Sequence, residues 1–357
     1  MLDSFQVPVI SEPSFFTQAR TRALEAFEAS NISLPKGFVL TSGSIHIDEK
    51  STPCVALPFS KAFSTYGALI AKTFVNEVQE DKDPLLLLSH AMHSDGLFIY
   101  VPPGVCVDAF SLVHANHLCA RVHIVIGKGS ELHVEERFAQ GCMTHVTCQV
   151  EEEGKLVFNS FAEKGVNLLT SYKIFLKEKA QGFLSIAQEA CLSRSSFQGV
   201  LQGAGAKATY ADFSAIGCGA CSERFSTIEH KAAETSSQKY VKRVICEGGL
   251  SRYTGKIVIQ KEGRGSKAHQ MHRALTLGPN AVAFASPIFD IFQPMTQATH
   301  GSTIAPFDEA MLFYAKARGI EENEAKSFLI QAFFDDILKY FSSDVRRELE
   351  ARIQWIR

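Results

Sequence analysis

The chain lacks the features that mark several large classes of protein. Its 357 residues carry a formal net charge of −2, which gives no general reason to expect a nucleic-acid or anionic-membrane partner. The first residues, MLDSFQVPVI, contain no basic segment followed by a long apolar one, so they do not resemble a secretory signal. The strongest apolar run, residues 85–88, is far too short to span a bilayer. We therefore expect a cytoplasmic protein that binds neither membrane nor nucleic acid.

Motifs for nucleotide hydrolysis and for a self-contained metal site are also missing. No Gly-Lys-Ser/Thr run occurs, and the GKG and GAG segments lack the strand–loop–helix context of a phosphate-binding loop. The nine cysteines are odd in number and have no framework spacing, which favours reduced thiols. Cys218 and Cys221 form the one Cys-x-x-Cys motif, but no second pair completes a four-ligand site, and a tight turn explains their spacing equally well.

Two histidine pairs lie in strand-like text and are poor candidates for a shared metal ion. They are His114 with His117, and His269 with His272. Residues three positions apart on a strand point to opposite faces, so neither pair can easily bind one ion. We expect surface or structural roles for both.

The N-terminal region, residues 1–82, contains two stretches with helical periodicity. Apolar residues recur at helical spacing over residues 13–30 and again over residues 60–80. The segment between them contains Pro35, Gly37, Gly43 and Pro53, and is expected to be loop or irregular strand.

Residues 83–298 have a different character, with short β-rich runs and little helical periodicity. LFIYV, VHIVIG, THVTCQVE, KLVFNSF and KIVIQ are examples, and glycines recur at intervals of roughly 21 to 28 residues. The glycines concerned are Gly104, Gly127, Gly154, Gly182 and Gly203. This pattern argues against βαβ units and leaves two architectures, a sandwich or barrel and a β-solenoid.

Helical signals return in residues 299–357, directly after His300. Asp308 can cap a helix that ends at Gly319, and a second helix is expected over residues 321–340 with acidic residues in its first turn. Ser343 can cap a third. The apolar residues of the second helix fall on more than one face, so one phenylalanine is expected to be left for a partner, although most such stripes face their own core.

The C-terminal half resembles the SufB/SufD family of iron–sulfur cluster assembly proteins. The matching residues are Thr299-His300-Gly301-Ser302-Thr303, Asp308-Glu309, Leu312-Phe313-Tyr314, Arg318-Gly319-Ile320, Glu324-Ala325, His230, Ser236, Gln238, Tyr240, Gln270, Arg273, Leu275, Pro287 and Asp290. HAMHSDGLFIYVPPGVCVD resembles the opening coil of the family. The similarity covers roughly residues 85–334, and the first eighty residues match poorly.

Departures from the family pattern favour the SufD branch. Met271 and Ala281 stand where SufB-type chains carry cysteines, and Ala298 replaces a further family cysteine two places before His300. Gly301 follows the histidine, as in SufD, where SufB has glutamate.

The resemblance implies a mainly β protein, a right-handed parallel β-helix flanked by N-terminal and C-terminal helical regions. It implies a non-catalytic scaffold subunit that pairs with SufB through the β-helix and binds the ATPase SufC through the C-terminal helices. His300 is the implied ligand of a transient iron–sulfur cluster shared with the partner chain, and the lone chain is expected to bind no cofactor. Tyr314, Arg318, Phe328 and Phe334 are the expected SufC-binding residues.

Other interpretations stay open from the residues alone. A lone histidine ahead of a helix often bonds a backbone group instead of a metal. A SufB-like homodimer that assembles clusters itself is opposed by Met271 and Ala281. A β-solenoid enzyme, such as a polysaccharide lyase or an acyltransferase, needs clustered charged residues on one coil face or hexapeptide repeats, and neither is evident.

Overall fold

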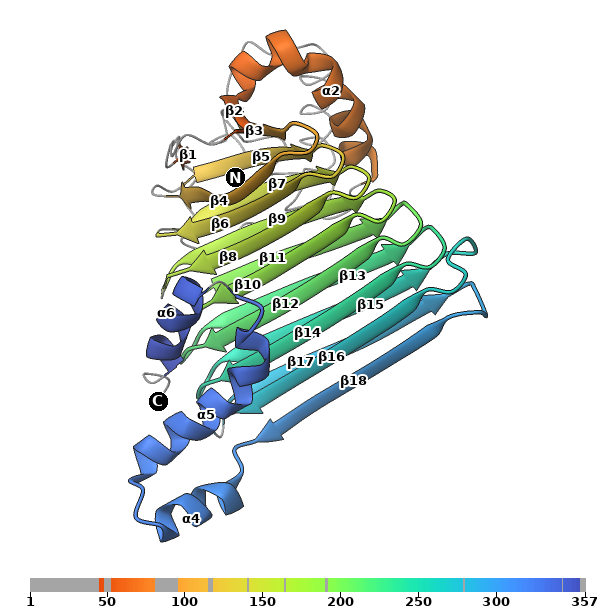
Figure 1. The fold of residues 1–357 in the computed structure, drawn as a ribbon. Helices are drawn as coiled ribbons and strands as arrows, with labels where there is room; N and C mark the ends of the chain where they lie inside the picture. Colours follow the sequence, from red (N-terminus) through yellow and green to blue (C-terminus); the bar gives the residue numbers. More distant parts are fainter. Residues whose placement is uncertain are drawn as a thin grey trace, which may run out of the picture.

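The chain folds into a parallel β-solenoid of eight coils with helices near both ends (Figure 1). The computed structural model describes residues 45–47, 53–80, 96–114, 118–139, 141–163, 165–189, 192–278, 280–341 and 343–353. Strands β3 to β18 supply two strands to each coil, one in each of two nine-stranded sheets. The expected β-helix is confirmed, and the sandwich and barrel alternatives are excluded because the neighbours in each sheet come from successive coils.

The two sheets contain alternate strands of the sequence. The first sheet contains β1 (Ile45–Ile47), β4 (Cys106–His114), β6 (Glu131–Phe138), β8 (Lys155–Ala162), β10 (Gln181–Gln188), β12 (Lys207–Ile216), β14 (Ser236–Ile245), β16 (Lys267–Thr276) and β18 (Gln297–Pro306). The second contains β2 (Val55–Pro58), β3 (Gly96–Val101), β5 (Leu118–Ile126), β7 (Cys142–Val150), β9 (Asn167–Leu176), β11 (Leu192–Leu201), β13 (Cys221–His230), β15 (Leu250–Ile259) and β17 (Val282–Ile291).

The register shows how long each coil is. Lys155 pairs with Gln181, a separation of 26 residues, and Lys267 pairs with Gln297, a separation of 30. Four of the five periodic glycines lie in the turns between strands, whereas Gly182 lies inside β10. At Gly203 an added Cβ would come within 2.0 Å of the backbone nitrogen of Glu178, so stacked turns require glycine there.

Side chains that alternate along each strand fill the space between the sheets. A single cluster of Val, Ile, Leu, Phe and Tyr side chains runs through the coils from Leu97 to Tyr253. Parallel strands that are covered on both faces favour such β-branched and aromatic residues. The interior therefore explains the runs of apolar residues that the sequence shows.

The interior also holds a fully buried ionic group. Asp212 lies 3.2 Å from Nε of Arg224 and 3.2 Å from a terminal nitrogen of Arg243. Burial works to raise the pKa of Asp212, but the guanidinium groups of Arg243 and Arg224 outweigh it and hold that pKa below its ordinary value. Arg224 also donates to Ser195 at 3.0 Å, so this arginine has a hydrogen-bond partner besides the carboxylate of Asp212.

The N-terminal end of the solenoid is closed. Strands β1 and β2 pair antiparallel with β4 and β3, and helix α2 (Phe59–Glu80) packs on β2 and β3. The ring of Phe59 lies over Gly96, where an added Cβ would come within 2.1 Å of it. The helix expected over residues 60–80 is confirmed, and the short strands occupy part of the segment expected to be loop or irregular strand. The helix expected over residues 13–30 lies outside the described residues.

Three helices follow β18. They are α4 (Glu309–Ala317), α5 (Glu322–Leu338) and α6 (Ser343–Ile353), and their positions agree with the sequence-based expectations. Asp308 caps α4 by accepting from the backbone N–H groups of Ala310 and Met311. Helix α5 packs on the outer face of the first sheet, with the rings of Phe213 and Phe334 4.1 Å apart.

Strand β18 runs to Pro306, so the β-structure continues past the boundary expected at residues 298–299, and the first C-terminal helix begins at Glu309. Within the described residues, none of the helices combines the length and the apolar character needed to cross a membrane.

Candidate functional site

The C-terminal end of the solenoid is open, because no coil follows β17 and β18. Both strands are the last in their sheets, and α4 to α6 turn back along the molecule (Figure 1). Large apolar side chains are exposed there, with 52% of Phe284 accessible to solvent. The others in this coil are Val282, Ile288, Ile291, Phe292, Met295 and Ile304. We call this region the open end.

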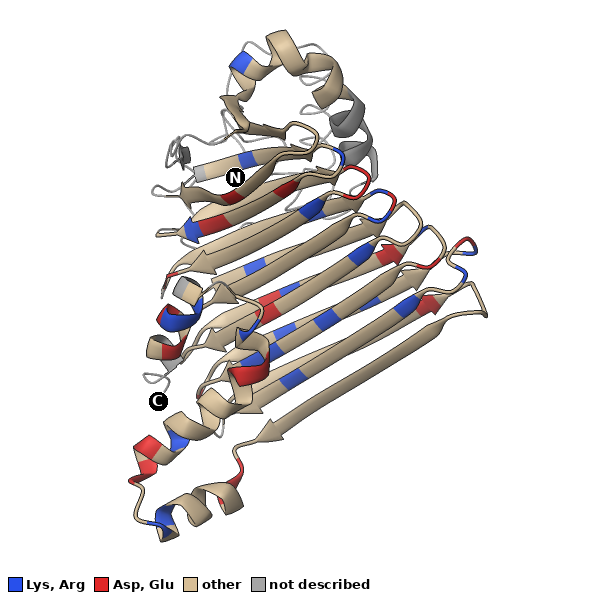
Figure 2. Cartoon of the chain, viewed as in Figure 1, with Lys and Arg blue, Asp and Glu red and all other residues tan. Residues whose placement is uncertain are grey.

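The strand β18 also lacks charge. Figure 2 shows no Lys, Arg, Asp or Glu along it, in contrast to most of the other strands. Asp290, the one charged residue of β17, forms an ion pair with Lys256 at 2.5 Å. Solvent-exposed edge strands usually carry charges that discourage pairing with another chain. Strand β18 lacks this protection.

His300 is the last residue of a column of inward-facing side chains. The register places it next to Gln270 of β16, and the column continues back through the solenoid one strand at a time. Its members in order are Val134, Phe158, Leu184, Tyr210, Lys239, Gln270 and His300. The column is apolar in the early coils and polar in the last four. His300 is exposed because no further residue covers it.

The neighbours of His300 are aromatic and polar. Its ring lies 4.6 Å from that of Phe289 on the facing strand β17. Behind it, the side-chain amide of Gln270 donates to the carbonyl of Gly255 at 3.1 Å, while Oε1 of Gln270 is buried with no partner among the described residues. The interior face next to His300 therefore presents an unused acceptor.

His272 and His269 point to opposite faces of β16, as the strand geometry predicts. His272 faces inward, stacks on Tyr253 at 5.0 Å and lies 3.3 Å from the hydroxyl of Ser302. Burial, with a contribution from Arg243, lowers the pKa of His272 to about 3, so it is neutral at physiological pH. His269 faces outward and forms a hydrogen bond with Thr299.

His114, from the other histidine pair, lies at the end of β4. It is buried and forms a hydrogen bond with Glu136 at 3.1 Å, which is a structural role.

The family positions around His300 that could carry cysteine hold other residues. The positions of the missing family cysteines are occupied by Met271 on the outer face of β16, by Ala281 just before β17, and by Ala298 on the inner face of β18. Across the described ranges, no three His, Cys, Asp or Glu side chains are grouped so that they could hold a metal ion. Within the described chain, His300 is therefore not part of a group of three or more such side chains.

Cys218 lies in a tight turn and Cys221 begins β13. The turn is closed by a bond from the Ala220 N–H to the Gly217 carbonyl, and Gly219 has a φ of +69°. This agrees with a turn as the reason for the spacing of the two cysteines. Burial, with a contribution from Glu223, raises the pKa of the Cys221 thiol, which lowers its reactivity.

The expected partner-binding residues of the C-terminal helices separate into two groups. Tyr314, Arg318 and Phe328 are exposed, and the guanidinium of Arg318 lies 4.5 Å from the centre of the Tyr314 ring. The assignment of Phe334 to a partner surface is wrong: its side chain is 0% exposed and holds α5 on the solenoid. Phe313 is 74% exposed but is not among the partner-binding residues expected from the sequence, where it appears only as part of the family motif.

Comparison with known proteins identifies the family. Residues 110–333, more than half of the chain, match the family model described as SUF system FeS cluster assembly, SufBD core domain. The chain is 22% identical over 307 residues to an iron-sulfur cluster assembly SufBD family protein of Staphylococcus aureus strain USA300, covering 80% of this chain and 65% of the relative.

A similar protein of Staphylococcus saprophyticus is 22% identical over 288 residues, or 75% of this chain and 61% of the relative. The chain thus spans less than two thirds of the length of these relatives. The matched core contains the coils from β4 onward and ends within α5, and it includes His300. The chain belongs to the SufBD family of iron–sulfur cluster assembly proteins.

Proposed function

We propose that this chain is a SufD-like, non-catalytic scaffold subunit of a SUF iron–sulfur cluster assembly complex. It pairs with SufB through the open end and binds the ATPase SufC through the C-terminal helices. The observation that carries the proposal is the position of His300, exposed on the inner face of the last strand, in a part of the sequence with no cysteine after Cys246. Such a histidine is suited to a site that a second chain completes.

The ligand chemistry supports a shared site. Iron–sulfur clusters are held mainly by thiolates, and an imidazole can replace a thiolate on one iron. With Met271, Ala281 and Ala298 in the family cysteine positions, this chain offers the imidazole and the partner would offer the thiolates. Since imidazole binds a metal only when its lone pair is free, the contribution of His300 would weaken as the pH falls.

The open end supports pairing with a second β-helix. Its strand edges offer unpaired backbone groups, and its exposed apolar side chains include Phe284 and Ile288. Addition of strands to an exposed edge supplies backbone hydrogen bonds, while neighbouring side chains supply specificity. The absence of charge on β18 is consistent with an edge that is covered in the assembled complex.

The exposed aromatic surface of α4 and α5 supports docking of SufC. Phe313, Tyr314 and Phe328 are exposed on two helices that contact each other. Exposed aromatic side chains and arginine are typical of residues that contribute most to protein interfaces. We assign Arg318 and these three residues to the SufC-binding surface.

Co-expression with SufB and SufC tests the assembly. Size-exclusion chromatography is expected to show one complex that contains all three chains. Substitution His300→Ala is expected to leave that complex intact while it lowers cluster assembly, measured from the visible absorption of anaerobically reconstituted protein. The matched control is His133→Ala, a histidine on the opposite half of the solenoid that bonds Glu131. Failure of the three chains to associate would overturn the proposal, and unchanged assembly in His300→Ala would remove the ligand role.

A SufB-like homodimer that assembles clusters itself makes the opposite prediction. Such a protein would hold a stable cluster when it is purified alone without oxygen. The absence of any cysteine after Cys246 argues against it, because the open end then offers no thiolate. Anaerobic purification of the single chain separates the two proposals.

A further inference from the structure

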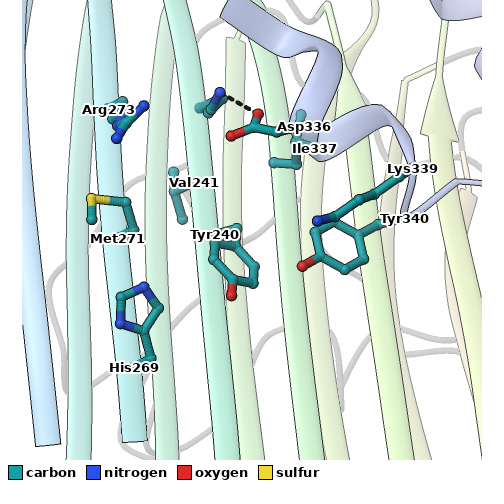
Figure 3. Close-up of a pocket in the computed structure, with 10 residues that line it drawn as sticks. Tyr240, Val241, His269, Met271, Arg273, Asp336, Ile337, Lys339 and Tyr340 are labelled. Atoms are coloured by element: carbon teal, nitrogen blue, oxygen red, sulfur yellow. Dashed lines mark hydrogen bonds and ion pairs between the residues drawn. The ribbon is translucent and has the colours of Figure 1, made fainter.

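A cavity lies between helix α5 and the outer face of strands β14 and β16, on the side of the sheet opposite to His300 (Figure 3). It measures about 170 Å³, well above the roughly 10 to 15 Å³ that a cavity needs on this measure to hold one water molecule. Its walls are formed by Tyr240, His269, Met271 and Arg273 from the sheet and by Lys339 and Tyr340 from the end of α5 and the turn after it. The proposed assembly role does not use these residues.

The cavity carries positive charge that nothing in the described chain neutralises. Asp336 is the one carboxylate in its lining, and it already forms an ion pair with Lys242. Arg273 and Lys339 line the same cavity and make no ion pair with any described residue. The neighbouring carboxylate of Asp335 is engaged by Arg346 at 3.4 Å. Two cations thus face the cavity without a counter-charge.

Hydrogen-bond donors line the same cavity as these two cations. The rings of Tyr240 and Tyr340 stack at 5.4 Å, and Figure 3 shows the Tyr340 hydroxyl directed toward Tyr240. The ring of His269 lies 5.7 Å from that of Tyr240. Nδ1 of His269 pairs with the Thr299 hydroxyl at 2.8 Å, so when Thr299 donates, Nε2 of His269 carries a proton. That proton has no acceptor among the described residues.

We propose that this cavity binds an oxyanion of the phosphate class. A guanidinium, an ammonium, phenol hydroxyls and an imidazole N–H are the donors that hold phosphate oxygens in proteins, and arginine binds such groups with two parallel hydrogen bonds. Met271 and the faces of the two tyrosines leave an apolar wall beside the charged groups. The oxyanion is either free phosphate or the phosphate group of a small metabolite.

The cavity is separate from the candidate cluster site. The cavity lies on the outer face of the sheet, whereas His300 lies on the inner face. Thr299, the partner of His269, is the residue directly before His300 on β18. An anion in the cavity would therefore act on the strand that carries the candidate ligand without touching the ligand itself.

Isothermal titration of the full 357-residue chain with inorganic phosphate, at constant pH and ionic strength, tests the proposal. Saturable binding at one site is expected, and sodium acetate in place of phosphate is expected to bind more weakly. Arg273→Gln and Lys339→Gln are each expected to raise Kd by about fivefold to tenfold, the loss of one charge-assisted hydrogen bond. Tyr240→Phe keeps the aromatic wall and is expected to raise Kd by about twofold to fivefold.

The matched control is Arg252→Gln, which removes the same charge from the outer face of the other sheet, where Arg252 lies over Phe284 at 5.4 Å. It is expected to leave Kd unchanged. Melting temperatures without phosphate confirm that each variant folds, which is expected because Arg252, Arg273 and Lys339 are exposed. The proposal is overturned if phosphate shows no saturable binding, if acetate binds as well as phosphate, or if Arg252→Gln weakens binding as much as Arg273→Gln.

Discussion

The two ends of the solenoid are built from the same coil but finish in opposite ways. At the N-terminal end, β1 and β2 add antiparallel strands and α2 covers the last apolar surface, so that Phe98 is 0% exposed. At the C-terminal end, β17 and β18 are bare, and the equivalent apolar side chains reach solvent. Repeat proteins need a polar cap at each end to stay soluble alone. A missing cap therefore marks the surface that another chain is expected to cover.

The largest expected difference between the two ends is in how much a substitution lowers the free energy of unfolding. Phe98→Ala removes a ring that lies 5.2 Å from that of Tyr66 of α2, and the cavity it leaves is expected to lower the free energy of unfolding by about 3 to 5 kcal/mol. Phe284→Ala, at the open end, is expected to change it by less than about 0.5 kcal/mol. Denaturant unfolding of the lone chain measures both. Equal costs would show that the open end is closed in solution by another contact.

The stability of the enclosed interior is expected to depend on pH, because it contains a buried histidine. Burial, with a contribution from Lys239, lowers the pKa of His230 to about 4. The unfolded chain then binds a proton that the folded chain does not, so stability is complete above about pH 6.5 and falls as the pH drops toward 4, by on the order of 3 kcal/mol in total.

His230→Gln is expected to reduce the slope of unfolding free energy against pH by about one proton in this window. His230 bonds Thr235 and Ser237 inside the coil, and glutamine keeps polar atoms there without a titrating group. His300→Gln, at the exposed end of its column, is the control and is expected to change stability by less than about 0.5 kcal/mol. An unchanged slope in His230→Gln would contradict the enclosed position of this histidine.

If the uncapped end of the solenoid is the interface, binding of a SufB partner depends on the side chains of the open end. Phe284→Asp places a charge on the exposed face of β17 and is expected to weaken binding of a SufB partner by about 30-fold or more, a cost of about 2 kcal/mol. Surface plasmon resonance with the immobilised partner measures it. The matched control is Phe225→Asp, on the same outer face two coils earlier, where the ring lies against Arg194. Equal losses in both variants would place the interface along the whole face instead of at its end.

The smallest expected effect on stability concerns the helices next to the open end. Phe328→Ala, an exposed position of α5, is expected to change unfolding free energy by less than about 0.5 kcal/mol while reducing co-purification of SufC. Phe334→Ala, six residues later, is the contrasting variant, because loss of its contact with Phe213 is expected to cost about 3 to 5 kcal/mol. If Phe328→Ala leaves SufC binding intact, this helix is not the docking surface.

Much of the fold could be predicted from local patterns. Short β-rich runs with glycine at coil-length intervals narrowed the fold to a solenoid or a sandwich or barrel, and the family resemblance favoured the solenoid. Asp308, Gly319 and Ser343 marked helix ends where the structure has them. These signals are local, since capping and left-handed turns depend on a few neighbouring residues. Phe334 shows the limit of this reasoning: its helical position did not reveal that the outer face of β12, 121 residues earlier, would cover it.

For the candidate site, too, some features follow from the sequence and others only from the tertiary structure. By itself, the sequence determined which side chains the candidate site can offer: a histidine followed by glycine, no cysteine after Cys246, and two helices with aromatic residues behind it. Only the tertiary structure decided that His300 faces inward, that it is the last of its column and that no coil covers it. The physical reason is that a strand residue's surroundings are set by the neighbouring strands, which lie 30 residues away in the chain at this coil.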